Sequence, residues 1–410
     1  MLETGYDIIF FWVARMIFMG LYLTGKEPFH TVYLHGLVRD EFNRKMSKSL
    51  NNIVDPLELM DQYGTDAVRF TFATSSTPGQ DFALQPLRLE AARNFANKLW
   101  NATRFVIGKL DDLPRDQSSL VAAGSLNDAP YTLADRWIIS RFNRLSGDVE
   151  RLLGSFNLGE AGRQIQSFFW EEFADWYIEV AKVQLEGDSE RQKLTRSVLY
   201  TVLEGTLRLL HPFTPFVTEV AWQHVTQGAL GRALIVASYP RGDEAALDAG
   251  AERDWTLIQE IVRGIRNARN ESNVEASRWI AATIAAGPKA TVVEQQRAAI
   301  SRLARVASDK LEIVEALPDK PQNATAFVAG TAEVYLPLAG MVDLAEERAR
   351  LAKELERAEA EVARRQAKLA NANFVNRAPA NIVQGERDLL HTAEVTAAKL
   401  REQVSALSTV

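Results

Sequence analysis

The most regular pattern in the chain is a helical spacing of apolar residues between about residues 87 and 211. Apolar positions recur there every three or four residues, in four segments separated by polar stretches. The four apolar stripes consist of Ala92, Phe95, Ala96, Leu99, Thr103, Val106 and Leu110; of Trp137, Ile138, Phe142, Leu145, Val149 and Leu152; of Ile165, Phe168, Phe169, Phe173, Trp176, Tyr177 and Val180; and of Leu194, Val198, Val202, Leu203, Leu207 and Leu210. Because each helix must bury its stripe, the pattern predicts a bundle of four to five helices.

A further short helix with Phe216, Val220 and Ala221 is expected after two prolines, Pro212 and Pro215. The aromatic residues of the bundle occur at helical spacing. We therefore interpret them as core residues rather than as platforms on which bases stack. The residues concerned are Trp100, Trp170, Phe173 and Trp176.

The first 80 residues combine a short apolar strand with helices. Residues 31–38 are typical of a buried strand, and a helix is expected to begin at Asp55-Pro56 and to end at Gly64. This order indicates the end of a parallel nucleotide-binding sheet, whose other strands we expect before Met1. Residues 8–23 are apolar but shorter than a membrane span, and Arg15 lies among them, so we expect a buried helix there and no membrane contact.

Two smaller regions follow the bundle. Residues 246–342 alternate helical and strand-like segments, which predicts a small α/β domain. Residues 343–410 contain two apolar series of heptad type, separated by a stretch with Pro379 and Gly385, and this predicts an antiparallel coiled-coil hairpin. The expected fold is mainly α, with domain limits at 1–80, 81–245, 246–342 and 343–410.

Composition narrows the possible chemistry. The 410 residues carry a net charge of -6, so contact with nucleic acid would need local basic patches rather than a basic whole. The sequence has no cysteine, which excludes disulfides, a thiol nucleophile and a cysteine-ligated zinc site. Its five histidines show no metal-ligand spacing, so we expect no protein-bound metal.

The pentapeptide Lys45-Met46-Ser47-Lys48-Ser49 is the most informative motif. It lies in a polar loop between the expected strand and the expected helix, and it places two lysines among small hydroxyl residues. Adenylyl and phosphoryl transfer need neutralisation of the charge that develops on the leaving pyrophosphate. Ammonium groups on a flexible loop can provide it, so the motif predicts chemistry with ATP.

KMSKS is the second signature of class I aminoacyl-tRNA synthetases, and the whole chain resembles the C-terminal half of the valyl-tRNA synthetase family. The resemblance rests on ETGYDIIFFWVARM, VYLHGLVRDEFNRKMSKSLNN, NKLWNATRF and the terminal coiled coil. It implies the end of a Rossmann-type catalytic domain, a bundle that binds the anticodon, and an arm that contacts tRNA. The implied reaction joins valine and ATP to valyl-adenylate and transfers valine to tRNA(Val), with Mg²⁺ accompanying ATP.

The resemblance also implies residue roles. Lys45 and Lys48 would stabilise the leaving pyrophosphate. The ATP-binding set is His35, Gly36, Lys45, Met46, Ser47, Lys48 and Ser49. Gly36 would let its backbone approach the adenosine, whereas His35 is as compatible with a structural role. Asp7 would hold the ammonium of valine, and Ile8 and Trp12 would line a pocket for its branched side chain; alternatively, Asp7 caps a helix and Trp12 belongs to the core.

Two places are candidates for contact with tRNA. Arg263, Arg266 and Arg269 form a basic stripe on one predicted helix, which is equally typical of a solvated face. Arg377 lies in the connection between the two helices of the arm. The apolar seam of the arm could instead serve self-association.

Other readings stay open on sequence alone. Within the class I synthetases an isoleucyl or leucyl enzyme is the nearest alternative, and outside catalysis the chain could be a tRNA-binding module. The first family signature and the editing domain are expected to precede Met1, so we expect this polypeptide to need that N-terminal half as a partner and to be inactive alone. We expect a cytoplasmic monomer.

Overall fold

The computed structural model describes residues 1–75, 77–111, 113–116, 120–121, 130–229, 231, 233–319, 321, 324–337, 344–370 and 380–406. The chain divides into two compact units, Met1–Thr256 and Leu257–Val410. The fold is mainly α, as predicted.

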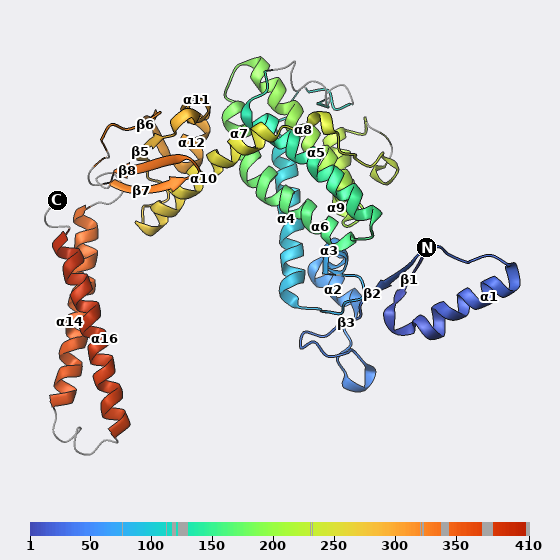
Figure 1. Cartoon of the computed structure of the whole chain (residues 1–410), viewed down its shortest axis with the longest axis horizontal. Helices are drawn as coiled ribbons and strands as arrows, with labels where there is room; N and C mark the ends of the chain where they lie inside the picture. Colours follow the sequence, from blue (N-terminus) through green and yellow to red (C-terminus); the bar gives the residue numbers. More distant parts are fainter. Residues whose placement is uncertain are drawn as a thin grey trace. The chain divides into compact units, whose positions relative to one another are not determined.

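The first unit begins with short parallel strand pairs and three helices (Figure 1). Strand β1 pairs with β2, and β3 pairs with β4, both in parallel. The elements are β1 Leu2–Gly5, α1 Ala14–Thr24, β2 Val32–His35, β3 Val38–Arg39, α2 Pro56–Tyr63, α3 Thr65–Ser75 and β4 Phe82–Ala83. The predicted limits of α2 are confirmed: Asp55 accepts a hydrogen bond from the Leu57 amide at 2.8 Å, and Gly64 ends the helix with a φ of 93°.

The single strand predicted at residues 31–38 is wrong in two respects. It is split at Gly36 into β2 and β3, and of these residues only Tyr33 and Gly36 are buried. A Cβ on Gly36 would lie 1.7 Å from the carbonyl oxygen of Gln80, so the backbone of a distant segment occupies the space beside this residue. In addition, β1 supplies a second strand that the sequence pattern did not reveal.

A helical bundle forms the rest of the first unit (Figure 1). Its helices are α4 Pro86–Ile107, α5 Leu133–Gly154, α6 Leu158–Ser167, the π-helical stretch Phe168–Tyr177, α7 Ile178–Gln184, α8 Ser189–Leu210 and α9 Pro215–Thr226. The predicted apolar stripes are buried, except that Ala96 and Leu194 are only half-buried. Three expected core positions are instead open to solvent: Trp100 is 37% exposed, Phe216 61% and Val220 46%.

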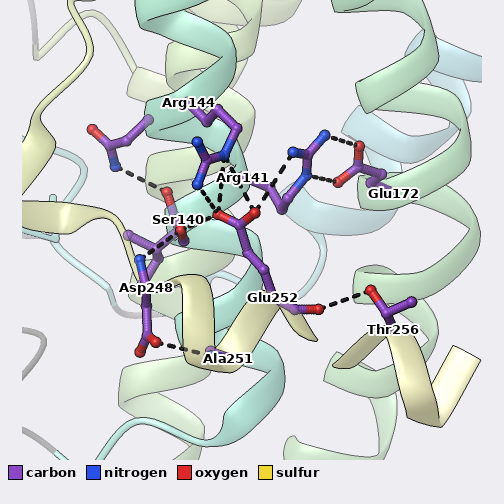
Figure 2. Close-up of polar contacts among 10 residues, drawn as sticks. Ser140, Arg141, Arg144, Glu172, Asp248, Ala251, Glu252 and Thr256 are labelled. Carbon is purple, nitrogen blue, oxygen red and sulfur yellow. Dashed lines mark hydrogen bonds and ion pairs between the residues drawn. The ribbon is translucent and has the colours of Figure 1, made fainter. Parts of the chain in front are cut away.

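Buried acids in the bundle all have partners of opposite charge or hydrogen-bond donors. Asp135, which is fully buried, accepts from the Tyr177 hydroxyl at 2.8 Å and from Arg191 at 2.6 Å. Figure 2 shows a second, half-buried cluster, in which Glu252 accepts from Ser140 and Arg144 and connects the start of α10, Ala249–Glu271, to α5. These contacts offset the cost of burying charge and fix which helix faces meet.

The second unit contains a four-stranded sheet with helices. The strand order is β6-β5-β8-β7, with β5 and β6 parallel and the other pairs antiparallel. The elements are α10 Ala249–Glu271, which begins in the first unit, β5 Ile280–Ala285, α11 Ala290–Gln295, α12 Arg297–Ala304, β6 Val306–Val314, β7 Ala324–Ala329 and β8 Ala332–Pro337. The predicted alternation of helices and strands in this region is confirmed.

Helices α14 Leu344–Ala370 and α16 Ala380–Ala406 run side by side (Figure 1). Two cross-helix ion pairs, Glu359 with Arg401 and Arg365 with Glu386, follow opposite directions along the two helices, as in an antiparallel pair. This confirms the predicted hairpin. Gly385 lies inside α16 rather than in the connection, which corrects its predicted place. Arg377 and Pro379 lie outside the described residues.

Candidate functional site

Polar contacts hold the KMSKS loop at its base. The Ser47 amide donates to Asn52 Oδ1 at 2.9 Å, and Asn52 Nδ2 donates to the Lys45 carbonyl at 3.3 Å. Ser47 also accepts from the Leu50 amide at 3.3 Å and so caps a single 3₁₀ turn, Lys48–Leu50. The loop therefore has a fixed backbone at its two ends, while the side chains of Lys45 and Lys48 are exposed.

Asp40 is the centre of this network, although the sequence did not single it out. Its carboxylate is 6% exposed and accepts from the amides of Phe42 and Arg44, from Arg44 Nε at 2.7 Å, and from Asn52 Nδ2 at 2.9 Å. Burial alone would raise the pKa of Asp40, but the hydrogen bonds from Asn52 and Arg44 outweigh it and lower the pKa to about 2. Asp40 therefore stays ionised and anchors Asn52, which in turn positions Ser47.

The structure brings Asp7 and the KMSKS loop together. Lys45 Nζ lies 3.9 Å from Asp7 Oδ2, with the two side chains 68% and 36% exposed. A pair this exposed contributes little to stability and can exchange partners readily. Asp7, which is expected to hold the ammonium group of valine, therefore already lies next to the ammonium group of Lys45.

Gly36 and His35 lie at the end of β2, as the sequence predicts. His35 Nδ1 is 2.9 Å from the Gly36 carbonyl oxygen. The adjoining Asp81, which follows Gln80, accepts from the Leu37 amide at 2.7 Å, from Arg39 Nε at 2.6 Å and from the Tyr6 hydroxyl at 3.2 Å. Mainly through the Leu37 amide bond, these contacts lower the pKa of Asp81. Asp81, which directly precedes β4, thereby joins Tyr6, the residue after β1, to Arg39 of β3.

Models of three known protein families match separate stretches of the chain. The model for "tRNA synthetases class I (I, L, M and V)" matches residues 1–85, which contain the loop. The model for "Anticodon-binding domain of tRNA ligase" matches residues 135–284, and that for "Valyl tRNA synthetase tRNA binding arm" matches residues 343–408. The chain belongs to the class I tRNA synthetases.

Among curated members of this synthetase family, the valine--tRNA ligase of Bacillus cereus (strain ATCC 10987 / NRS 248) is 43% identical over 94% of the chain. The valine--tRNA ligase of Bacillus subtilis (strain 168) is 42% identical over 94% of the chain. The chain spans 43% of the length of each of these relatives. A solved LeuRS of Agrobacterium radiobacter K84, in a ternary complex with tRNA and LeuAMS, is 21% identical in sequence and has a TM-score of 0.48. The match covers 60% of this chain and 29% of that chain.

Two residues predicted to line a valine pocket, Ile8 and Trp12, are open to solvent in the part of the chain that the structure describes. Ile8 is 40% exposed and Trp12 56%. They begin a stretch, Tyr6–Thr24, that is long and apolar enough to cross a membrane by length and composition alone, and of which 6% is buried. Our expectation of a buried helix was wrong, because the described residues leave its apolar side chains uncovered: Phe10 is 78% exposed and Phe18 66%.

The arginine stripe of α10 is not a continuous basic surface. Arg269 is only 6% exposed and donates to the carbonyls of Arg305 at 3.3 Å and Glu275 at 3.0 Å, and burial lowers its pKa. Its predicted contact with phosphate is therefore corrected to a structural role. Arg266 is exposed but donates to the Leu303 carbonyl at 2.9 Å, and Arg263 is exposed.

Within the described ranges, no group of three or more His, Cys, Asp or Glu side chains is placed to hold a metal ion. Of the residues that organise the loop, Ser47 belongs to the predicted motif, and Asn52 lies three residues after its last position. Asp40 and Asp81 acquire their roles from contacts made after the chain has folded.

Proposed function

We propose that this chain is part of a valine–tRNA ligase, in which it supplies the KMSKS loop, part of the valine pocket and the surfaces that bind tRNA(Val). In the reaction, a carboxylate oxygen of valine attacks the α-phosphorus of ATP, the bond to the bridging oxygen of the β-phosphate breaks, and pyrophosphate leaves. Valine is then transferred from the adenylate to tRNA. The observation that carries the proposal is the geometry of the loop: a fixed base with two exposed ammonium groups.

Lys45 and Lys48 would neutralise the charge that grows on the departing pyrophosphate. A loop that is already ordered by Asn52 and Ser47 loses little entropy when its lysines engage phosphate, so more of their interaction favours the transition state. Mg²⁺ would enter as part of the ATP substrate and be held largely by phosphate oxygens, which suits its preference for few protein ligands.

The contact between Lys45 and Asp7 suggests an order of events. Before valine binds, Asp7 has the Lys45 ammonium as its neighbour at 3.9 Å. The ammonium of valine would take that place, and Lys45 would become available to the phosphates. Ile8 and Trp12 would then be covered by the bound amino acid and by the remainder of the enzyme.

The proposal can be tested in a chimaera in which this chain replaces the matching region of the Bacillus subtilis valine–tRNA ligase. Valine-dependent exchange of pyrophosphate into ATP should be measurable, and Lys48→Ala should lower its rate by about 10²- to 10³-fold without changing the KM for valine. Lys26→Ala is the matched control, since Lys26 is also exposed but lies outside the loop.

Each result has a distinct meaning. A Lys48→Ala rate within about threefold of the unsubstituted chimaera would remove the catalytic role of the loop. Exchange that depends on isoleucine rather than on valine would favour an isoleucyl enzyme. An inert chimaera, together with intact binding of valine tRNA by this chain, would favour a non-catalytic tRNA-binding module.

A further inference from the structure

A groove of about 530 Å³ lies between α2, α3, α4 and α9 in the first unit. Its walls include Tyr63, Arg93, Asn97, Trp100, Phe216 and Val220. The groove is apart from the KMSKS loop, and the residues expected to bind ATP or valine do not line it.

The aromatic and apolar walls of this groove are unusually open. Trp100 is 37% exposed, Phe216 61% and Val220 46%, whereas Trp176 and Phe173 of the same bundle are buried as expected. Leaving so much apolar surface in water is unfavourable, at about 25 cal/mol for each Å². A flat apolar ligand that covered Trp100 and Phe216 would remove this cost.

The polar groups of the groove indicate which flat ligand would fit. The Arg93 guanidinium lies 5.8 Å from the centre of the Tyr63 ring, where it can contact an anion while remaining stacked. Asn97, one helical turn after Arg93, is exposed and carries both a donor and an acceptor. A flat ring, an anion and hydrogen-bonding edges occur together in a nucleotide.

The acid in the groove does not oppose this reading. Asp66 is 8% exposed, and its carboxylate oxygens accept from the amides of Phe216 at 3.3 Å and Val217 at 2.6 Å. Its charge is thus directed at the start of α9, where the helix dipole compensates it. The exposed charge in the groove is that of Arg93.

We propose that this groove holds one base of the RNA partner, stacked on Trp100 and Phe216, with the neighbouring phosphate at Arg93. The inference rests on the proposed function, because it presumes that the chain binds tRNA. It assigns part of that binding to a surface beside α2 and α3, next to the catalytic region rather than on the arm.

The test measures binding of a Bacillus subtilis valine tRNA transcript to the full chain by fluorescence anisotropy. Trp100→Ala should weaken binding by between about fivefold and about a hundredfold, which is the range for loss of one base stack, while Trp100→Phe should retain most of the affinity. Trp279→Ala is the matched control: Trp279 is 47% exposed but lies outside the groove, so its loss should change the affinity less than twofold.

A second measurement separates phosphate contact from packing. Arg93→Gln should reduce the steepness with which log affinity falls against log salt by about 0.7 to 0.9, the contribution of one phosphate. Thermal unfolding of each variant is recorded alongside. A Trp100→Ala variant that melts markedly earlier but binds like Trp279→Ala would show that Trp100 stabilises the protein and does not contact RNA, which would overturn the proposal.

The two levels of failure can be told apart. Tight binding by the unsubstituted chain, together with unchanged affinity in Trp100→Ala and an unchanged salt slope in Arg93→Gln, overturns the groove and leaves the proposed function standing. Absence of any binding by the unsubstituted chain overturns both.

Discussion

Asp66 offers a sharp test of how the region after the KMSKS loop is joined to the bundle. Helix α9 begins with Pro215, and the preceding Thr214 makes no side-chain cap. The free amides of Phe216 and Val217 are instead satisfied by Asp66, from α3, about 150 residues earlier in the chain. Asp66→Ala would leave both amides without this acceptor at a partly buried helix start.

The expected cost is about 2 kcal/mol, at the upper end of measured helix caps. Hydrogen bonds to a charged acceptor contribute about 1.5 to 3 kcal/mol each. Part of this hydrogen-bond energy is lost, because burial disfavours the charged form of Asp66. Burial is the largest influence and raises the pKa of Asp66 despite the two amide bonds. For a unit of this size, 2 kcal/mol corresponds to a melting temperature about 4 to 8 °C lower.

The raised pKa also fixes how stability depends on pH. Between the unfolded value of 3.8 and the higher folded value, the native state keeps a proton that the unfolded state has lost. The contribution of Asp66 to the free energy of unfolding therefore falls as the pH rises through this window. Asp66→Asn cannot titrate, so the stability advantage of the original residue over Asn should shrink over the same window.

Urea unfolding, followed by tryptophan fluorescence, measures these differences. Asp188→Ala is the comparison, since Asp188 caps the exposed start of α8 through the Arg191 amide at 2.8 Å and should cost only about 1 kcal/mol. If Asp66→Ala unfolds within about 0.5 kcal/mol of the unsubstituted chain, the long-range cap does not join the two regions and the reasoning fails.

Two further predictions concern the bundle and the arm. Asp135→Ala should destabilise the first unit by about 3 to 5 kcal/mol in the same urea assay, because it takes the carboxylate partner away from Arg191 and from the buried Tyr177 hydroxyl. Asp148→Ala, which breaks an exposed ion pair, should cost less than about 0.5 kcal/mol, and equal costs for the two variants would contradict this. In the arm, a hydrogen bond from Lys368 is the main cause that lowers the pKa of Glu386, so its stabilising effect is lost as the pH falls through the carboxylate range. Hydrogen exchange of α14 and α16, corrected for intrinsic rates, should therefore accelerate in acid, and less so in Glu386→Gln; identical responses would exclude the effect.

Local signals in the sequence predicted the elements whose limits are set by neighbouring residues. The Asp55 cap and the Gly64 stop fixed α2, and the apolar stripes identified the helices of the bundle, because both depend on residues within one or two turns. The heptad series likewise predicted the hairpin. Arg365 occupies a position of that series where an apolar residue is expected, yet α14 continues through it. Its guanidinium pairs with Glu386 of the other helix.

Features that depend on distant segments were not predictable in this way. The break at Gly36 results from the approach of Gln80, and β1 becomes a strand only because β2 pairs with it. Trp100 has the helical spacing of a core residue, yet its side of α4 faces an open groove. Periodicity indicates which face of a helix is apolar, but it does not show whether another element covers that face.

In the candidate site, likewise, the local motif was predictable from the sequence and the tertiary contacts that support it were not. The motif itself predicted where exposed lysines would lie, but the rigidity of the loop comes from Asp40 and Asn52, which are twelve residues apart and meet at 2.9 Å. Lysine suits the exposed positions, because a flexible ammonium can leave one partner for another at little cost, whereas a forked guanidinium holds its geometry. The loop therefore combines a base that is fixed before substrate binds with lysine side chains that can change partners. The weak contact of Lys45 with Asp7 is the arrangement from which such a change would start.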